Sequence, residues 1–378
     1  KNNGFGGILA DDMGLGKTLQ VIAFLLSEKQ EEQNKTALIV CPASLLYNWK
    51  SEIERFAPEL SVTMIWGNNQ ERKVQIEAIG KEDVVITSYD LLRRDVEWYE
   101  KIRFGYQILD EAQYIKNHTT QAAKSVKEIK AGFKLALTGT PIENRLSELW
   151  SIFDYLMPGF LYSYNRFRTD FEIPIVQAKS EADTERLKKM IRPFILRRLK
   201  KDVLKDLPEK LEENIVIKFS KEQEELYKAH VGRLKALLDN QTGEEFAKGK
   251  VQIFSELTRL RQICCEPSLV YENYMGESAK LQACVEMLKN AVESGHKVLV
   301  FSQFTTMLSH LQKQMRKEKI PYFSLIGSTV KENRAKMVEK FNAGEVPVFF
   351  ISLKAGGTGL NLTAADIVIH YDPWWNVA

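Results

Sequence analysis

The first eighteen residues constrain this chain more than any other part of it. Gly7–Ala10 is a short apolar run, Asp11–Gly16 is a polar loop-forming stretch, and Lys17-Thr18 opens an amphipathic segment. This order predicts a buried strand, a tight loop and a helix. Gly14 and Gly16 would let the loop backbone curl so that its N–H groups face an anion. The positive end of the following helix favours the same charge.

These residues predict a site for the phosphates of a nucleotide. Lys17 can reach the β- and γ-phosphates of ATP, and the Thr18 hydroxyl can ligate Mg²⁺. The first glycine of the general phosphate-loop pattern is Asp11 here, so the match is imperfect. An ordinary glycine turn into a helix is the alternative. The residues expected to hold the nucleotide are Gly14, Leu15, Gly16, Lys17 and Thr18.

A pair of carboxylates follows another apolar run. Tyr106–Leu109 precedes Asp110 and Glu111. If both runs are strands of one parallel sheet, this pair and the phosphate loop lie at the same carboxyl edge, where ligands bind. Asp110 would then hold Mg²⁺, and Glu111 would polarise the attacking water. An Asp-Glu pair alone is more often a solvated turn, but together with the loop it predicts ATP hydrolysis. The Thr-Gly-Thr-Pro string at 138–141 either senses the γ-phosphate or is a simple turn.

Apolar strand-like runs alternate with helical patterns in the first and last parts of the chain. This alternation predicts α/β domains with parallel sheets covered on both faces. Between them the apolar residues recur at helical spacing, and the charged stretches 177–189 and 239–250 are expected to be loops or helix ends. The predicted organisation is one α/β lobe at 1–150, a helical insertion and linker at 151–270, and a second α/β lobe at 271–378.

Composition excludes several classes of protein. The net charge is only +3, so any surface for nucleic acid must be local. The four cysteines form no CxxC pair, which argues against a zinc site or a disulfide framework. No apolar run is long enough to cross a bilayer, and the chain begins without a signal peptide. We therefore expect an intracellular protein with no membrane partner.

Several strings of residues, taken together, resemble the superfamily-two helicase-type ATPases. The version is that of the Swi/Snf-type chromatin-remodelling and DNA-translocase family. The first-half strings are Asp11–Thr18, Asp110–Gln113 and Leu137–Asn144. The later strings are Arg197–Val203, Leu207–Lys210, Arg261–Cys264, Val300–Phe304, Ser352–Leu362 and Tyr371–Asn376. The resemblance runs from one end of the chain to the other.

The resemblance implies two RecA-like lobes that bind ATP with Mg²⁺ in the cleft between them. Gln113 stands where most relatives have histidine, at the position that links hydrolysis to the neighbouring segment Thr138–Thr140. Glutamine both donates and accepts hydrogen bonds, so this link can be kept. The catalytic residues implied are Lys17, Asp110, Glu111 and Gln113, with Thr18 and Asp110 as the Mg²⁺ ligands.

The resemblance also implies that double-stranded DNA lies across both lobes. Hydroxyls, amides and backbone N–H groups of glycine grip phosphates without reading bases, so binding would be independent of sequence and weakened by salt. The candidate contacts are Ser44, Thr87, Ser88, Tyr89, Ser302, Gln303, Lys354, Gly356, Gly357, Thr358 and Asn361. A solvated surface role is the alternative for the single hydroxyls.

The predicted function is an ATP-dependent double-stranded DNA translocase that remodels or displaces protein–DNA complexes without separating strands. Its protein client is not specified by the sequence. A strand-separating or RNA helicase and a nucleotide-gated scaffold that binds a partner are the alternatives. The compact insertion favours a bacterial member, which would be cytoplasmic; a eukaryotic one would be nuclear.

The ends of the sequence lead to a further expectation. Relatives have an adenine-contacting element before the phosphate loop, and arginine fingers in a segment after Trp374–Asn376. We therefore expect a core fragment that binds ATP and DNA but hydrolyses ATP weakly, because such arginines contribute strongly to phosphoryl transfer.

Overall fold

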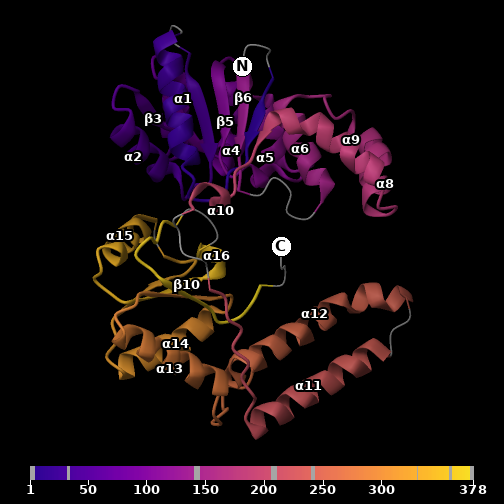
Figure 1. The fold of residues 1–378 in the computed structure, drawn as a ribbon, viewed down its shortest axis with the longest axis vertical. Helices are drawn as coiled ribbons and strands as arrows, with labels where there is room; N and C mark the ends of the chain where they lie inside the picture. The colour runs from indigo at the N-terminus through magenta and orange to yellow at the C-terminus, as the bar shows by residue number, and fades with distance from the viewer. Residues whose placement is uncertain are drawn as a thin grey trace. The chain divides into compact units, whose positions relative to one another are not determined.

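The computed structural model describes residues 5–31, 35–139, 145–205, 211–239, 243–329, 331–356 and 360–374. The chain divides into two compact units, residues 1–209 and 210–377. Each unit is built on its own parallel sheet (Figure 1). The predicted α/β class with two parallel-sheet lobes is therefore confirmed, and the helices predicted around residues 151–270 are shared between the two units.

The first unit contains a sheet of seven strands in the order β3-β4-β2-β5-β6-β1-β7, with every neighbouring pair parallel. Its central strands are apolar and β-branched, and all residues of β2 and β4 are buried. This burial is typical of a sheet covered by helices on both faces. The strands are β1 Gly7–Leu9, β2 Ala37–Cys41, β3 Val62–Met64, β4 Val84–Ser88, β5 Arg103–Leu109, β6 Lys130–Leu137 and β7 Ile195–Leu196.

Helices of the first unit pack on the two faces of this sheet as two apolar clusters. On one face, Ile22 of α1 and Trp49 of α2 pack over the strands; on the other, Leu92 of α4, Val126 of α5 and Phe153 of α6 do so. The helices are α1 Lys17–Glu31, α2 Leu46–Phe56, α3 Asn69–Glu77, α4 Tyr89–Asp95, α5 Gln121–Glu128, α6 Leu146–Leu156, α7 Tyr164–Phe167, α8 Ile173–Val176, α9 Glu181–Ile191 and α10 Lys200–Val203.

The stretch 177–189, expected to be a loop or helix end, is largely helical instead. Helix α9 spans Glu181–Ile191, and the Ser180 side chain caps it by accepting a hydrogen bond from the N–H of Asp183. Acidic residues in its first turn and lysines in its last turn both favour the helix dipole. The high charge of this stretch therefore belongs to an exposed helix rather than to a loop.

The second unit contains a four-stranded parallel sheet in the order β11-β8-β10-β9. Apolar clusters again lie on both faces, with Leu308 of α14 in one and Phe341 of α15 in the other. The elements are α11 Lys221–Asp239, α12 Gly243–Cys265, α13 Ala279–Glu293, β8 Val298–Ser302, α14 Thr305–Lys317, β9 Tyr322–Leu325, α15 Lys331–Asn342, β10 Val348–Ser352, α16 Leu353–Gly356 and β11 Ile367–His370.

Helices α11 and α12 form a hairpin that is fixed by buried polar contacts. One ring nitrogen of His230 lies 2.8 Å from the Glu256 carboxylate, and the other lies 2.7 Å from the Tyr271 hydroxyl. The Gln223 side chain donates to the carbonyl of Ile263 at 2.7 Å. Because both ring nitrogens of His230 and the amide nitrogen of Gln223 have partners, these contacts hold the hairpin in one register.

Parallel pairing brings the ends of the first unit's strands to one edge. Leu9 pairs with Leu137, and Leu109 pairs with Ala136, so β1, β6 and β5 end at the same level. The residues that follow these strands are therefore the ones that can share a site. Among the described residues, no helix combines the length and the apolar character needed to span a membrane.

Candidate active site

The loop between β1 and α1 has the backbone conformation that its glycines suggest. Gly14 has φ of +86° and Gly16 has φ of +72°, both in the left-handed region. A side chain at either position would be strained, which explains why the loop uses glycine. Helix α1 begins directly after the loop at Lys17, so Lys17 and Thr18 lie in its first turn.

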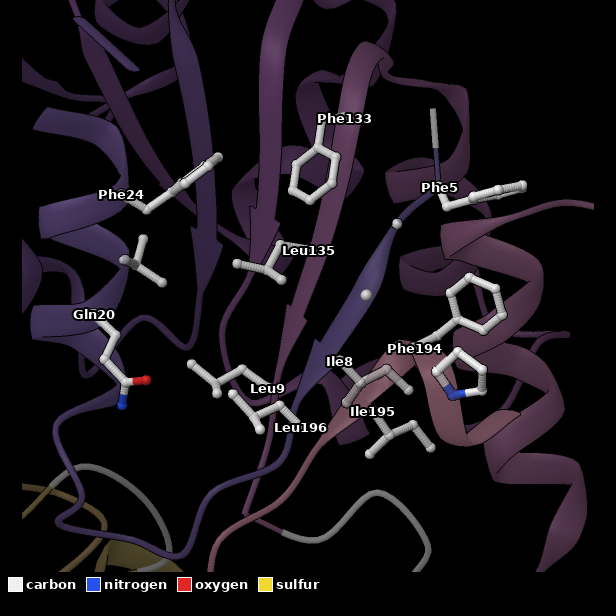
Figure 2. Close-up of a pocket in the computed structure, with 14 residues that line it drawn as sticks. Phe5, Ile8, Leu9, Gln20, Phe24, Phe133, Leu135, Phe194, Ile195 and Leu196 are labelled. Carbon is white, nitrogen blue, oxygen red and sulfur yellow. The ribbon is translucent and has the colours of Figure 1, made fainter. Parts of the chain in front are cut away.

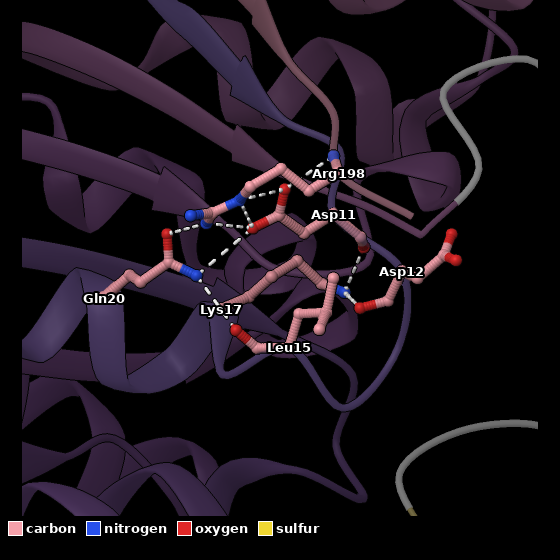
Figure 3. A network of polar contacts seen from close by, with 6 residues as sticks. All are labelled: Asp11, Asp12, Leu15, Lys17, Gln20 and Arg198. Atoms are coloured by element: carbon pink, nitrogen blue, oxygen red, sulfur yellow. Dashed lines mark hydrogen bonds and ion pairs between the residues drawn. The ribbon is translucent and has the colours of Figure 1, made fainter. Parts of the chain in front are cut away.

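The ammonium of Lys17 turns back over the loop. Its Nζ donates to the carbonyl of Asp11 at 2.7 Å and to the carbonyl of Asp12 at 3.3 Å (Figure 3). These two hydrogen bonds hold the positive charge of Lys17 beside the first residues of the loop. The charge is thus positioned beside the helix N-terminus, which also favours an anion.

Asp11 occupies the position of the usual first glycine, and it is completely buried. Its carboxylate accepts hydrogen bonds from the backbone N–H of Arg198 at 3.0 Å, from the Arg198 guanidinium, and from the Gln20 amide at 3.2 Å (Figure 3). Burial alone would raise the pKa of Asp11, but the hydrogen bonds from Arg198 and Gln20 outweigh it and hold that pKa below its usual value. Asp11, which replaces the first glycine of the general pattern, therefore fixes the loop to Arg198 and Gln20.

Asp110 follows β5 at the same edge and is almost fully buried. Its carboxylate accepts a hydrogen bond from the indole N–H of Trp49 at 2.8 Å and from the backbone N–H of Glu111 at 2.9 Å. Burial raises the pKa of Asp110 to about 6; the Trp49 hydrogen bond opposes that rise and the Glu111 charge adds to it. A nearby cation would stabilise the ionised form of this buried carboxylate.

Glu111, Gln113 and Thr138 form a continuous chain of hydrogen bonds. The Gln113 amide donates to the Glu111 carboxylate at 2.6 Å, and the Thr138 hydroxyl donates to the Gln113 side-chain oxygen at 3.0 Å. Glu111 has φ of +52°, a left-handed conformation that costs a non-glycine residue on the order of 1 kcal/mol. The bridge that the sequence predicts between Gln113 and Thr138 is present, whereas Thr140 lies outside the described residues.

The candidate DNA-contacting residues of the first unit lie at this edge, but mostly below its surface. Thr87 and Ser88 end β4 and are buried, and the Ser88 hydroxyl caps α4 by accepting from the N–H of Leu91. The Tyr89 hydroxyl donates to the carbonyl of Asp110 at 2.8 Å. Ser44, half-buried in the turn before α2, is the most accessible of the four. Three of these side chains thus have local structural partners or are enclosed.

Among the candidates of the second unit, Ser302 and Gln303 lie at the carboxyl end of β8, and Lys354 lies directly after β10. Ser302 is buried, its hydroxyl donates to the Asp372 carboxylate, and the Gln303 N–H donates to the same carboxylate at 3.1 Å. Exposed Lys354 belongs to α16. The remaining candidates are Gly356, at the end of α16; Asn361, whose carbonyl accepts from Asn342 at 2.9 Å; and Gly357 and Thr358, which lie outside the described residues.

Three residues of this site were not predicted from the sequence as part of it. Trp49 comes from the buried face of α2, Gln20 from the first turns of α1, and Arg198 from far along the chain. Arg198 lies in the string Arg197–Val203, which carries part of the family resemblance, but that string assigns it no role at the phosphate loop. Trp49 and Gln20 carry no signal, because amphipathic helices contain such residues routinely.

An apolar pocket of about 830 Å³ lies next to the phosphate loop. Figure 2 shows side chains of β1, β6 and β7 along one wall, with Phe24 and Gln20 of α1 opposite. Gln20 therefore lines this pocket and also bonds to Asp11. The pocket and the polar network share one side chain.

Comparison with known proteins agrees with this architecture. Residues 1–269 match the SNF2-related domain, and residues 279–378 match the helicase conserved C-terminal domain. The Sulfolobus solfataricus SWI2/SNF2 ATPase core in complex with dsDNA matches with a TM-score of 0.53 and 38% identity, covering 99% of this chain and 79% of that one. The two sheets and the phosphate loop define a helicase-like ATPase core. The chain belongs to the SNF2-related family.

Curated relatives include bacterial and eukaryotic proteins. An uncharacterized ATP-dependent helicase of Mycoplasma genitalium is 41% identical over 384 residues, which is 100% of this chain and 36% of that protein. The SWI/SNF-related matrix-associated actin-dependent regulator of chromatin subfamily A member 1 of Mus musculus is 36% identical over 392 residues, 99% of this chain and 37% of that protein. The chain thus spans little more than a third of the length of these relatives.

Proposed function

We propose that this chain is the motor of an ATP-dependent translocase that moves along double-stranded DNA and displaces or remodels bound proteins without separating the strands. Membership of the SNF2-related family supports the ATP-driven part. The observation that carries the proposal is the joining of the phosphate loop, Asp110 and the Glu111–Gln113–Thr138 chain at one sheet edge.

In this proposal the phosphate loop binds the nucleotide and the neighbouring strand end activates water. Backbone N–H groups at Gly14, Leu15 and Gly16 face the phosphates, and Lys17 leaves its two loop carbonyls to contact them. Glu111 accepts a proton or a hydrogen bond from the attacking water. Gln113 holds Glu111 in position. Through its hydrogen bond with Thr138, it links hydrolysis to the end of β6.

The residues at this edge also fit Mg²⁺. Thr18 offers a hydroxyl and Asp110 a carboxylate, and Mg²⁺ prefers oxygen ligands. Mg²⁺ at nucleotide sites is held by one or two protein oxygens, with phosphates and water supplying the rest. Accordingly, the described residues contain no group of three or more His, Cys, Asp and Glu side chains that could hold a metal alone. When bound, Mg²⁺ would neutralise charge on the phosphates, and it would draw the raised pKa of Asp110 downward.

The DNA part of the proposal rests on the solved relative, which contains duplex DNA. Exposed Lys354 and half-buried Ser44 are the accessible candidates for phosphate contacts. Contacts of this type recognise the backbone and not the bases, so the client is chosen by other means. The DNA-bound protein that is displaced is therefore not specified by the motor. A bacterial protein of this kind would act in the cytoplasm.

The test is displacement of a triplex-forming strand from duplex DNA by the full-length protein, with and without ATP. We expect displacement only with ATP, no unwinding of the duplex, and loss of displacement in Lys17→Ala and in Glu111→Gln. ATP hydrolysis stimulated by single-stranded RNA and not by duplex DNA would contradict the proposal. Unwinding of a forked duplex would favour the strand-separating alternative.

A further inference from the structure

The segment that follows β7 runs alongside the phosphate loop. The Ala10 N–H donates to the carbonyl of Leu196 at 2.7 Å, and the Asp12 N–H donates to the carbonyl of Arg198 at 3.0 Å. These bonds continue the parallel pairing of β1 with β7 beyond the last paired strand residue. The backbone of residues 196–198 is therefore placed by the loop itself.

Side chains of the loop fix this segment further. The buried Asp11 carboxylate binds both the backbone N–H and the guanidinium of Arg198. The Asp12 carboxylate accepts a hydrogen bond from the backbone N–H of Lys200 at 2.9 Å. Both aspartates that precede the glycines thus hold the basic segment, and they set the point from which the Lys200 side chain starts.

The Lys200 side chain lies over the loop at Gly14. Its Cε and Nζ atoms are 3.2 and 3.3 Å from the point where a Cβ on Gly14 would stand. Gly14 has φ of +86° and no side chain, so this face of the loop is open to the lysine. The ammonium is therefore close to the backbone of the phosphate loop.

The cations near the loop differ in whether they have partners. Arg198 is committed to Asp11, and the Lys17 ammonium donates to two loop carbonyls. Among the described residues the Lys200 ammonium forms no ion pair. An unpaired ammonium over a loop of backbone N–H groups strengthens the positive potential for an anion.

We propose that Lys200 is a second phosphate-binding lysine of this site, which contacts the terminal phosphates of a nucleoside triphosphate together with Lys17. The inference rests on the proposed function, because it assigns a further contact to the same nucleotide. Lys200 lies in the segment after β7. The pairing of that segment with β1 and its hydrogen bonds to Asp11 and Asp12 place the lysine beside the loop.

The test compares nucleotide affinity in the full-length protein, using fluorescent ATP and ADP analogues with Mg²⁺. Lys200→Ala should weaken ATP binding about tenfold, as expected for the loss of one charge-assisted contact. The ADP analogue should lose less, since it lacks the terminal phosphate. Lys200→Arg should keep most of the affinity. The matched control is Lys201→Ala, an exposed lysine in the same short helix, which should bind as the wild type does.

The outcomes separate this inference from the function on which it rests. If the wild type binds ATP, Lys17→Ala weakens binding, and Lys200→Ala behaves like Lys201→Ala, the Lys200 contact is wrong and the ATPase proposal stands. If the wild type binds no ATP, both are wrong. Melting curves of the variants show whether a lost affinity reflects unfolding. A Lys200 effect that shrinks as salt rises supports a direct charge contact.

Discussion

The hydroxyl of Thr138 donates a hydrogen bond of 3.0 Å to the side-chain oxygen of Gln113. The Gln113 amide in turn holds Glu111, so the end of β6 is joined to the predicted water-activating residue. Gln113→Ala would leave Glu111 free to turn away from its working position. A displacement of this kind lowers turnover on the order of 10²-fold.

We expect Gln113→Ala to lower DNA-stimulated ATP hydrolysis by that factor while the affinity for ATP stays the same. Gln113→His should retain more activity than Gln113→Ala, because an imidazole also offers a donor and an acceptor. Steady-state kinetics alongside equilibrium nucleotide binding separates the two effects. Equal losses in binding and turnover would show that Gln113 only supports the fold.

The second prediction concerns the pH dependence of stability at Asp110. The folded protein raises the pKa of this carboxyl to about 6 from an ordinary 3.8. The stabilisation from its protonated form is therefore complete below pH 3.8, and it is lost as the pH rises through 6. In Asp110→Asn this loss is absent. Between pH 4 and pH 8 the free energy of unfolding of the wild type should therefore fall by on the order of 3 kcal/mol relative to that of Asp110→Asn.

Chemical denaturation without Mg²⁺ or nucleotide, at several pH values, measures this shift. The comparison uses the change with pH, so the loss of one hydrogen bond in the variant cancels. A constant difference between wild type and variant across this range would mean that Asp110 has an ordinary pKa in the folded protein.

The third prediction concerns the indole donor to that same carboxylate. Trp49 is buried, and its N–H donates to Asp110 at 2.8 Å. Trp49→Phe keeps an aromatic ring but removes the donor, and loss of a hydrogen bond to a buried charged group costs about 1.5–3 kcal/mol. The exposed Trp66 provides the control, since Trp66→Phe should leave the unfolding free energy nearly unchanged. Destabilisation by Trp49→Phe should be smaller at pH 5 than at pH 8.

The fourth prediction concerns the pair formed by Asp11 and Arg198. Arg198→Ala leaves the buried carboxylate without its guanidinium, so the melting temperature should fall. Because the pKa of Asp11 is lowered, the stabilisation is present at neutral pH and lost as the pH falls through that pKa. Arg197→Ala, at the exposed neighbour, should have little effect.

A double variant tests whether the two residues act as a pair. Asp11→Gly restores the glycine of the general loop pattern and removes the carboxylate partner of Arg198. Adding Arg198→Ala to Asp11→Gly should then lower the melting temperature less than Arg198→Ala does alone, because only the hydrogen bond from Arg198 to the Gln20 side-chain oxygen remains to be lost. Additive losses from the two substitutions would show that Arg198 stabilises the protein through other contacts.

The fifth prediction concerns the salt dependence of DNA binding. If exposed Lys354 contacts a DNA phosphate, Lys354→Ala should weaken duplex binding regardless of sequence. It should also reduce the slope of log affinity against log salt by about 0.9. The control is Lys340→Ala, whose ammonium is paired with Glu345 at 3.0 Å. An unchanged slope in Lys354→Ala would exclude this residue from the interface.

Local patterns were sufficient to predict most strands and the loop. The apolar runs 37–41 and 298–302 form β2 and β8, and the amphipathic period of 279–293 forms α13, so local pattern specifies each of these elements. The two-residue strand β7 was not predicted. It pairs with β1, and nothing within two residues can indicate a partner so far away in the sequence.

The parts of the candidate site whose residues lie in one short stretch of sequence could be predicted. Lys17 and Asp110 each follow an apolar strand, and parallel pairing brings those strand ends together. Partners that depend on packing were missed, as with Trp49 and Arg198. The sequence shows only the chemical type of hydroxyls such as that of Ser302, whereas the packed structure reveals that this one donates to Asp372.

The position of β1 in the sheet has a consequence for synthesis of the protein on the ribosome. This strand precedes β2–β7 along the chain, yet its two neighbours are β6 and β7, the last strands of the first unit. At about 5–20 residues per second, roughly 10 to 40 s separate β1 from the residues of β7. For all of that time β1 lacks β7, and Asp11 and Asp12 lack the backbone N–H groups of Arg198 and Lys200. The nascent chain is therefore exposed to aggregation until Arg198 has left the exit tunnel, and slowing translation before that point should lower the yield of folded protein.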